Sequence, residues 1–199
     1  MIILAITGEN TNKKIFLQFI FMIVVVDNGK GADEIASCIR LSKKILKPKE
    51  AANAKANAYI LSDGDLKNQA DNLKVIKSAN GPLLGIGAGC MFVGAAFGAK
   101  VKEGVKKKGM ERLSLKKPCP LTLDLKRMFA VMEDYQNIFS ELPENFAVVA
   151  SSKGYEFEII QESANPFFGV QFSPEQGGDG RKILMNFERF VEVWEKYHK

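Results

Sequence analysis

The stretch 82–90, PLLGIGAGC, constrains the fold more than any other part of the chain. Its apolar first half, 82–86, predicts a short buried strand, and a helix is expected from about 89 to 97. The glycines between them suit a turn so tight that a side chain would clash. A strand, a glycine turn and a helix form the elbow by which an α/β sheet presents a nucleophile at its carboxyl edge. At the tip of this elbow stands Gly87, which has no side chain to present.

Strand and helix patterns alternate in the chain before this elbow. Apolar runs predict strands at 23–26 and 58–61, and helical patterns predict helices at 32–46 and 66–79. With the elbow, this makes a third strand–helix unit, so a mostly parallel sheet is expected, flanked by helices on both faces. The predicted fold class is therefore a three-layer α/β fold, in which ligands bind outside the carboxyl ends of the strands.

The pattern changes after Gly98, where short segments are typical of mixed or antiparallel strands. The expected strands are 99–105, 111–115, 128–132, 146–150, 155–161 and 167–172. An amphipathic helix is expected at 180–197. Since no repeat, linker or low-complexity segment divides the chain, residues 22–199 are predicted to form a single domain.

Residues 1–21 fit this pattern poorly. The apolar run 15–26 is shorter than the roughly 20 residues that a membrane helix needs. No small-residue cleavage site of a secretory signal follows it. Two interpretations stay open: an added strand or arm, or an upstream start codon before a true beginning at Met22. The clean start of the alternating pattern at Met22 favours the second.

The composition indicates the cellular compartment of the protein and limits the kinds of partner that we expect. In this chain of 199 residues, 28 basic and 23 acidic side chains give a net charge of +5, which is a mild bias. The three cysteines Cys38, Cys90 and Cys119 have no metal-ligand spacing and no even disulfide count, as is typical of the reducing cytoplasm. We expect a cytoplasmic protein without a metal, a cofactor or a membrane contact.

Six sequence blocks follow one another in an order that resembles a known family. They are IVVVDNG, AYILSDGD, PLLGIGAGC, FGAKV, ELPENFAVVASS and GVQFSPE. This order, which covers nearly all of 22–199, resembles the class I (triad) glutamine amidotransferases, and within them the glutaminase subunit of archaeal GMP synthase. The resemblance implies a flavodoxin-like core with the mostly parallel sheet and flanking helices already expected.

The catalytic residues do not follow the resemblance. The family hydrolyses glutamine with a cysteine that a histidine activates and a glutamate orients. The positions that match are Gly87 for the nucleophile, Ser173 for the base and Glu175 for the orienting residue. Only Glu175 matches the family, so the triad is degenerate and the usual glutaminase chemistry is not expected. The one histidine, His198, lies at the end of the chain, where termini are usually mobile.

Two other features bear on the vacant site. Cys90 lies about one helical turn past the elbow tip, where a helix N-terminus can lower a thiol pKa, so it is a candidate alternative nucleophile. The favoured interpretation of Cys90 is a small buried hydrophobic residue. By the resemblance, the backbone N–H groups of Gly64 and Ala88 would form an oxyanion hole.

The loop that carries Gly64 also holds Asp63 and Asp65, in place of a glycine and a proline of the family. Negative charge there opposes the stabilisation of an anion, unless the carboxylates face solvent or pair with lysine. A solvated turn with local side-chain hydrogen bonds is the alternative interpretation.

The segment Lys100–Lys117 is rich in lysine. It could form an electrostatic patch for an acidic partner or nucleic acid, or lysines on an exposed edge strand could prevent aggregation. No aromatic residues interrupt the run, which disfavours nucleic-acid stacking.

Three functions stay open. The leading hypothesis is a non-catalytic relative that regulates or scaffolds an ATP-pyrophosphatase (synthetase) subunit or an active amidotransferase paralogue, with a glutamine-like ligand still able to bind. The rival is a working, ammonia-donating subunit of GMP synthase, in which Cys90 or a partner's residues rebuild the site. The third is a polyanion-binding protein that uses Lys100–Lys117.

Overall fold

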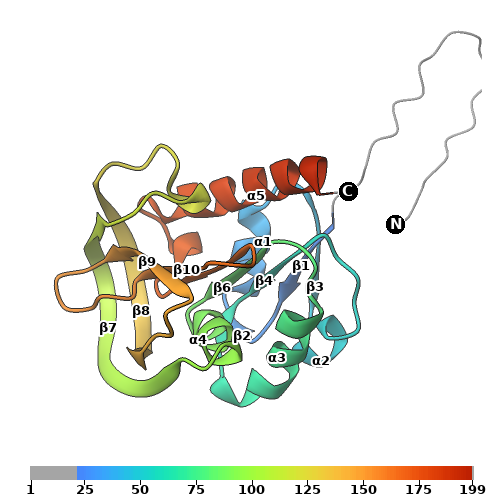
Figure 1. Ribbon diagram of the computed structural model, residues 1–199, viewed down its shortest axis with the longest axis horizontal. Helices are drawn as coiled ribbons and strands as arrows, with labels where there is room; N and C mark the ends of the chain where they lie inside the picture. The colour runs from blue at the N-terminus through green and yellow to red at the C-terminus, as the bar shows by residue number, and fades with distance from the viewer. Residues whose placement is uncertain (1–21, 199) are drawn as a thin grey trace, which may run out of the picture.

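The described residues, 22–198, are built on one large sheet in the computed structural model (Figure 1). The open question of an arm or a start codon in residues 1–21 lies outside this part of the chain. The strands are β1 (Met22–Val26), β3 (Ser42–Leu46), β4 (Ala58–Leu61), β6 (Leu83–Ile86), β7 (Lys100–Leu115), β8 (Met128–Glu141), β9 (Phe146–Ser151), β10 (Ile159–Glu162) and β11 (Phe167–Val170). Their order across the nine-stranded sheet is β3-β1-β4-β6-β11-β10-β9-β7-β8.

The sheet has a parallel half and an antiparallel half. Strands β3, β1, β4, β6 and β11 pair in parallel, and from β11 through β10, β9 and β7 to β8 every pairing is antiparallel. A second, two-stranded ribbon joins β2 (Gly29–Lys30) to β5 (Asp63–Gly64) beyond the ends of β1 and β4. This ribbon therefore lies at the carboxyl edge of the parallel strands, where ligands bind in such sheets.

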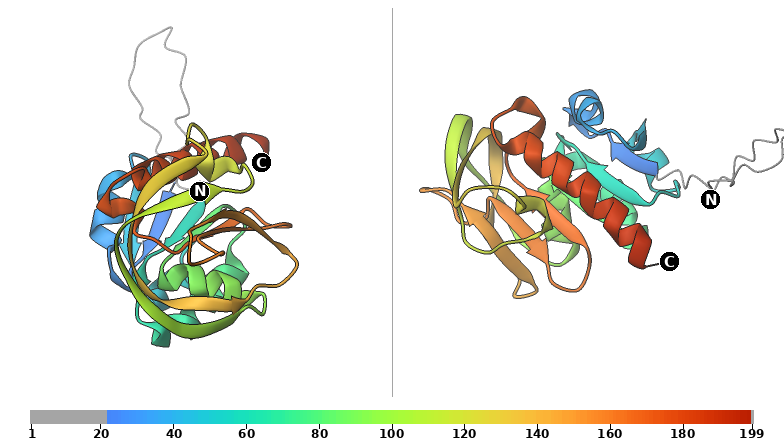
Figure 2. Two further views of the ribbon diagram at one scale, coloured as in Figure 1. Left: turned by 90° about the vertical axis from the view of Figure 1, so that its left-hand side faces the viewer. Right: turned by 90° about the horizontal axis from the view of Figure 1, so that it is seen from above.

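Helices cover both faces of the parallel half (Figures 1 and 2). They are α1 (Ala32–Cys38), α2 (Pro48–Ala51), α3 (Gln69–Ser78), α4 (Ala88–Ala96) and α5 (Gly180–Tyr197), with short 3-10 turns η1 (Leu66–Asn68), η2 (Pro120–Thr122) and η3 (Pro174–Gln176). One apolar cluster packs α1 and α5 against the sheet, and the other packs α3 and α4 against the opposite face. Successive residues of β1, Val24 and Val25, contribute to different clusters, as expected for a strand buried on both sides.

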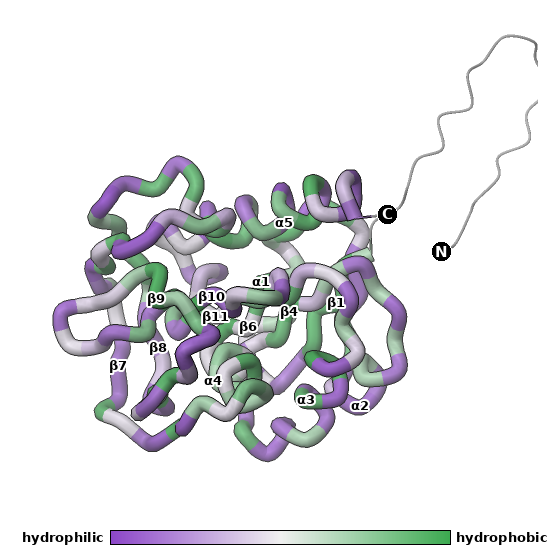
Figure 3. The backbone as a smooth tube through the Cα atoms, in the orientation of Figure 1, coloured by the Kyte–Doolittle hydropathy of each residue, from purple (hydrophilic) through white to green (hydrophobic). Residues whose placement is uncertain are grey.

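The predicted α/β fold class is confirmed, and the elbow and the last helix lie where the sequence places them. The periodicity that predicts a helix over 180–197 is that of α5, whose buried side chains include Ile183, Leu184, Phe187 and Val191. Figure 3 shows this alternation of hydrophilic and hydrophobic residues along α5. Apart from Ala99, the two predicted segments 99–105 and 111–115 belong to a single long strand, β7, which forms a curved ribbon with β8 (Figure 2).

The predicted helix over 32–46 is wrong beyond Cys38. Helix α1 ends there, Ile39 is extended, and residues 42–46 form β3, which pairs in parallel with β1 at the edge of the sheet. The backbone N–H groups of Arg40 and Leu41, at the turn between helix and strand, both donate to the buried carboxylate of Glu188 on α5. Long-range pairing with β1 and this distant acceptor override the local helical pattern.

Candidate functional site

The elbow between β6 and α4 brings the backbone of Gly87 to the carboxyl edge of the sheet. Its N–H donates to the carbonyl of Val170 at 2.9 Å, which anchors the turn to β11. Gly87 has a φ of 56° and a ψ of −114°, a conformation that glycine adopts without strain and other residues rarely adopt. A Cβ atom at this position would overlap the Asp63 carboxyl group, lying 2.5 Å from its Cγ. The space for a side chain at the elbow is therefore already filled.

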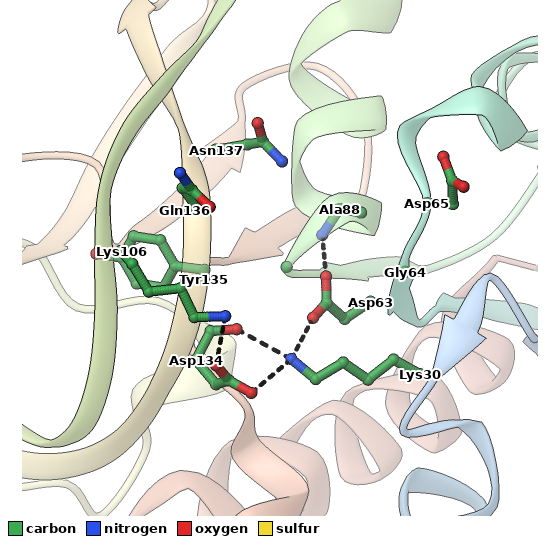
Figure 4. Close-up of a pocket in the computed structure, with 11 residues that line it drawn as sticks. Lys30, Asp63, Gly64, Asp65, Ala88, Lys106, Asp134, Tyr135, Gln136 and Asn137 are labelled. Atoms are coloured by element: carbon green, nitrogen blue, oxygen red, sulfur yellow. Dashed lines mark hydrogen bonds and ion pairs between the residues drawn. The ribbon is translucent and has the colours of Figure 1, made fainter.

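Asp63 fills that space and engages the first N–H of the helix. Its Oδ1 accepts a hydrogen bond from the backbone N–H of Ala88 at 2.8 Å, and its Oδ2 lies 2.8 Å from Nζ of Lys30 (Figure 4). The N–H of Ala88 is one of the two donors that the resemblance assigns to an oxyanion hole. In this structure an internal carboxylate occupies that donor.

A chain of ion pairs continues from Asp63 across the pocket to the long ribbon. Nζ of Lys30 also lies 2.9 Å from Oδ2 of Asp134 on β8 and donates to the Asp134 carbonyl at 3.0 Å. The other carboxylate oxygen of Asp134 pairs with Lys106 of β7 at 3.1 Å. The hydrogen bond from Lys30 lowers the pKa of Asp134. Burial opposes the charge on Lys30, but its two carboxylate partners outweigh that effect and raise its pKa. Both groups stay ionised at neutral pH, so this chain of ion pairs joins the two halves of the sheet.

The pocket at this edge has a volume of about 410 Å³ (Figure 4). Its lining residues are Lys30, Asp63, Gly64, Asp65, Gly87, Ala88, Lys106, Asp134, Tyr135, Gln136 and Asn137. The structure thus brings together Gly64, Gly87 and Ala88, three of the positions singled out in the sequence. It adds Lys30 and Asp134, which sequence reasoning missed because their partners are remote along the chain. In the sequence, Lys106 is distinguished only as a member of the lysine-rich run.

The two aspartates of the Gly64 loop differ in role. Asp63 points into the pocket and pairs with Lys30, whereas Asp65 accepts the N–H of Lys67 at 2.9 Å and pairs with its Nζ at 2.7 Å. Asp65 therefore matches the alternative interpretation of a local turn. Asp63 matches the condition that a carboxylate here be paired with lysine.

Ser173 and Glu175 lie beside this pocket, outside the set of residues that line it. Ser173 is buried, and its backbone N–H donates to the Met132 carbonyl at 2.8 Å. Glu175 is also buried, and its Oε2 has no hydrogen-bond partner in the described part of the chain. Burial raises the pKa of Glu175 to about 7, with the charge of Asp63 acting in the same direction and that of Lys30 against it. Glu175 is thus partly protonated at neutral pH.

Cys90 lies in the interior of the molecule. Its side chain has no solvent exposure, and its Sγ would lie 2.5 Å from a Cβ placed at Gly169 on β11. Burial raises the pKa of its thiol well above the ordinary value, and the charge of Glu158 acts in the same direction. A buried neutral thiol is a poor nucleophile. Cys119 is also buried and Cys38 is half-buried.

A second buried polar cluster includes Tyr135, which also lines the pocket, and Gln171, which the sequence analysis names only as part of the block GVQFSPE. The hydroxyl of Tyr135 donates to Oε1 of Glu158 at 2.8 Å, and Gln171 donates to the hydroxyl of Tyr155 at 3.1 Å. Burial, together with the charge of the neighbouring Glu133, raises the pKa of Glu158 to about 8. This environment favours the protonated form of the Glu158 carboxyl group.

The part of the chain that the structure describes contains neither a group of possible metal ligands nor a helix that could span a membrane. Across residues 22–198, no three His, Cys, Asp or Glu side chains lie together as a metal would require. No helix in the same range combines the length and apolarity needed to cross a membrane.

Comparison with known proteins identifies the family of this fold and elbow. A family model described as glutamine amidotransferase class-I matches residues 24–193, so the chain belongs to the class I glutamine amidotransferases. It is 30% identical over 183 residues to a subunit of the glutamine-hydrolyzing GMP synthase of Pyrococcus abyssi, covering 84% of this chain and 97% of that protein. The corresponding subunit of Methanocaldococcus jannaschii is 27% identical over 179 residues, covering 83% and 95%.

Solved structures agree on the fold. A crystal structure described as a GMP synthase subunit from Thermoplasma acidophilum has a TM-score of 0.85 and 24% identity, covering 90% of this chain and 98% of that one. A glutamine amidotransferase structure from Thermotoga maritima has a TM-score of 0.66 at 16% identity, covering 88% and 94%. The predicted class I fold and the similarity to the glutaminase component of GMP synthase are both confirmed.

Proposed function

We propose that this chain is a non-catalytic glutamine amidotransferase that acts by binding a partner protein. The observation that carries the proposal is the position of the Asp63 carboxylate. It fills the space of an elbow side chain, and it takes the N–H of Ala88. The tetrahedral intermediate of glutamine hydrolysis needs a nucleophile and free hydrogen-bond donors at the elbow. The Asp63 carboxylate occupies this position instead. Gly87 and Ser173 supply neither a thiol nor an imidazole at the matching positions.

The geometry of Cys90 supports the same proposal against its enzymatic rival. A relocated nucleophile would have to reach the pocket, and Cys90 is fully buried with a raised thiol pKa. A glutaminase that worked through Cys90 would need α4 to move away from β11. The rival, an ammonia-donating subunit, therefore requires residues from a partner.

The partner that we propose is an ATP-pyrophosphatase subunit of GMP synthase, with an active amidotransferase paralogue as the second candidate. The relatives named above are subunits of a GMP synthase, and the chain covers nearly their whole length. The family-model match over residues 24–193 supports a retained fold, and we propose that the partner-binding surface is retained with it. The cytoplasmic location expected from the three cysteines is part of this proposal.

Two measurements on the purified protein test the proposal. Glutamate release from glutamine is followed for the protein alone and together with an ATP-pyrophosphatase subunit, and the related Pyrococcus abyssi protein serves as positive control. We expect no glutamate release above the uncatalysed rate, either from the protein alone or with the ATP-pyrophosphatase subunit. Co-elution with the synthetase on gel filtration is the expected sign of binding. Turnover by the wild-type chain that disappears in Cys90→Ser would overturn the non-catalytic function, and absence of co-elution with either candidate would overturn the partner.

A further inference from the structure

A second hollow lies where β7, β8 and β9 meet, and it shares no residue with the elbow pocket. Its volume is about 400 Å³, within the range of small-molecule sites. Its lining residues are Glu111, Arg112, Ser114, Lys116, Met128, Ser151, Ser152 and Lys153. Three cations against one carboxylate give the hollow an excess of positive charge.

The strand geometry gathers these groups on one face. Arg112, Ser114 and Lys116 alternate along β7 and its continuation, so they share a side, while the intervening Leu113 is fully buried on the other. Ser114 pairs with Ser151 of β9, which carries the turn to Lys153. The backbone N–H of Lys116 donates to the Val149 carbonyl at 2.8 Å and fixes the end of the strand.

The charges of this hollow have no internal partner among residues 22–198. None of the ion pairs in this range includes Arg112, Lys116 or Lys153. The one acidic side chain, Glu111, already accepts the backbone N–H of Arg112 at 2.8 Å. The basic groups therefore remain available to a ligand. This differs from Lys30 and Lys106 in the elbow pocket, which internal carboxylates neutralise.

We propose that this hollow binds a small phosphate-bearing anion. A guanidinium fork, two ammonium groups and the hydroxyls of Ser114 and Ser151 on paired strands suit the several oxygens and double charge of a phosphate group. The lining includes no aromatic ring on which a base could stack, and Met128 is its one large apolar side chain. Recognition therefore centres on the phosphate and not on a nucleic-acid chain. This site is independent of glutamine chemistry and of the proposed partner.

Isothermal titration of the full chain tests the site with four probes: inorganic phosphate, pyrophosphate, AMP and a single-stranded oligonucleotide. We expect one phosphate-bearing small molecule per chain. Arg112→Gln/Lys153→Gln is expected to weaken its binding by at least about tenfold, because the loss of even one charged hydrogen bond costs about that factor. The control Lys44→Gln/Lys102→Gln removes the same charge from exposed positions on β3 and β7 outside the hollow and should leave affinity within about twofold.

Each result of the titration either supports the anion site or contradicts it. Binding of AMP over phosphate would assign the ligand as a nucleotide, and equal binding would assign it as free phosphate; both support the site. The proposal fails if no small anion binds at millimolar concentration. It also fails if the two double variants lose affinity equally, or if the oligonucleotide binds while the small anions do not. Circular dichroism of both variants confirms that each is folded.

Discussion

The Oδ1 atom of Asp63 accepts the backbone N–H of Ala88 at 2.8 Å, across a gap of 25 residues in sequence. The bond joins the loop after β4 to the first residue of α4. Because a helix N-terminus attracts negative charge, this is a favourable place for a carboxylate. Lys30 holds the same carboxylate from the other side at 2.8 Å. The elbow is thus stabilised by an anion that the chain itself supplies, and an external anion would have to displace it.

A cysteine introduced at the elbow without any other change should destabilise the fold. In Gly87→Cys the new Cβ would collide with the Asp63 carboxyl group and adopt a strained φ, so we expect the free energy of unfolding to fall by about 1–3 kcal/mol. Asp63→Gly/Gly87→Cys should recover the steric part of this loss. Urea unfolding of both variants measures the difference. Equal destabilisation in both would show that Asp63 does not occupy the elbow.

The same positions allow a gain-of-function test. The triple variant Asp63→Gly/Gly87→Cys/Ser173→His replaces the blocking carboxylate and places a thiol and an imidazole at the positions that the resemblance assigns to the nucleophile and the base. We expect this variant to release glutamate from glutamine at a measurable rate, while each single variant stays at background. If the folded triple variant were inert, then Gly87, Ser173 and Glu175 would not form a triad in space.

Lys30 should matter more for stability than its half-exposed position suggests. Lys30→Met leaves the carboxylates of Asp63 and Asp134 facing one another without their shared cation, and we expect a loss of about 1–2 kcal/mol. Lys67→Met is the control, because its partner Asp65 lies at the exposed surface, and little change is expected there. Thermal unfolding compares the two. A loss in Lys67→Met that matched the loss in Lys30→Met would contradict a special role for the chain of ion pairs.

Local patterns predicted the parts of this fold that local physics determines. The glycines of the elbow, the buried run of β1 and the apolar stripe of α5 each carry their own signal, because burial on one or both faces dictates residue type. The second half of the segment 32–46 carries no such signal, because these residues form β3 only by pairing with β1. A helical pattern cannot reveal an edge strand whose partner is remote.

The residues of the candidate site were also predictable only in part. Gly64, Gly87 and Ala88 follow from the turn chemistry of two loops and the family resemblance. The contact between Lys30 and Asp134 joins residues 104 positions apart, across both halves of the sheet, and no spacing rule links them. The sequence shows that residue 63 is an aspartate, but it does not show where the side chain points. The side chain points into the pocket because of its tertiary contacts with Lys30 and Ala88.

Glu188 should be essential for the turn from α1 to β3. Its carboxylate accepts the backbone N–H groups of Arg40 and Leu41, and its removal would leave both donors unsatisfied next to the core. We expect Glu188→Ala to lower the free energy of unfolding by about 2–4 kcal/mol. Glu192→Ala, on the exposed face of the same helix, is the matched control and should change stability little. Equal effects in urea unfolding would show that the loss comes from helix propensity.

The buried carboxyl of Glu158 predicts a pH dependence of stability with a definite sign. Its pKa is about 8 in the folded protein and about 4.5 when exposed, so the folded state holds a proton that the unfolded state releases. This contribution is complete below about pH 4.5 and is lost as the pH rises through 8. Glu175, with a folded pKa of about 7, acts in the same direction. The free energy of unfolding should therefore fall by a few kcal/mol between about pH 5 and pH 8, at about 1.4 kcal/mol per pKa unit.

Glu158→Gln separates this titration from packing. The amide keeps an oxygen that accepts the Tyr135 hydroxyl, as Oε1 of Glu158 does at 2.8 Å, but it has no proton to lose. We expect the variant to match the wild type near pH 5 and to exceed it in stability near pH 8, so the slope against pH becomes shallower. Glu133, which also has a raised pKa because of burial, leaves a residual slope. The exposed neighbour Glu156→Gln is the control and should keep the wild-type slope. A Glu158→Gln profile parallel to that of the wild type would mean that this carboxyl group is already ionised in the folded protein.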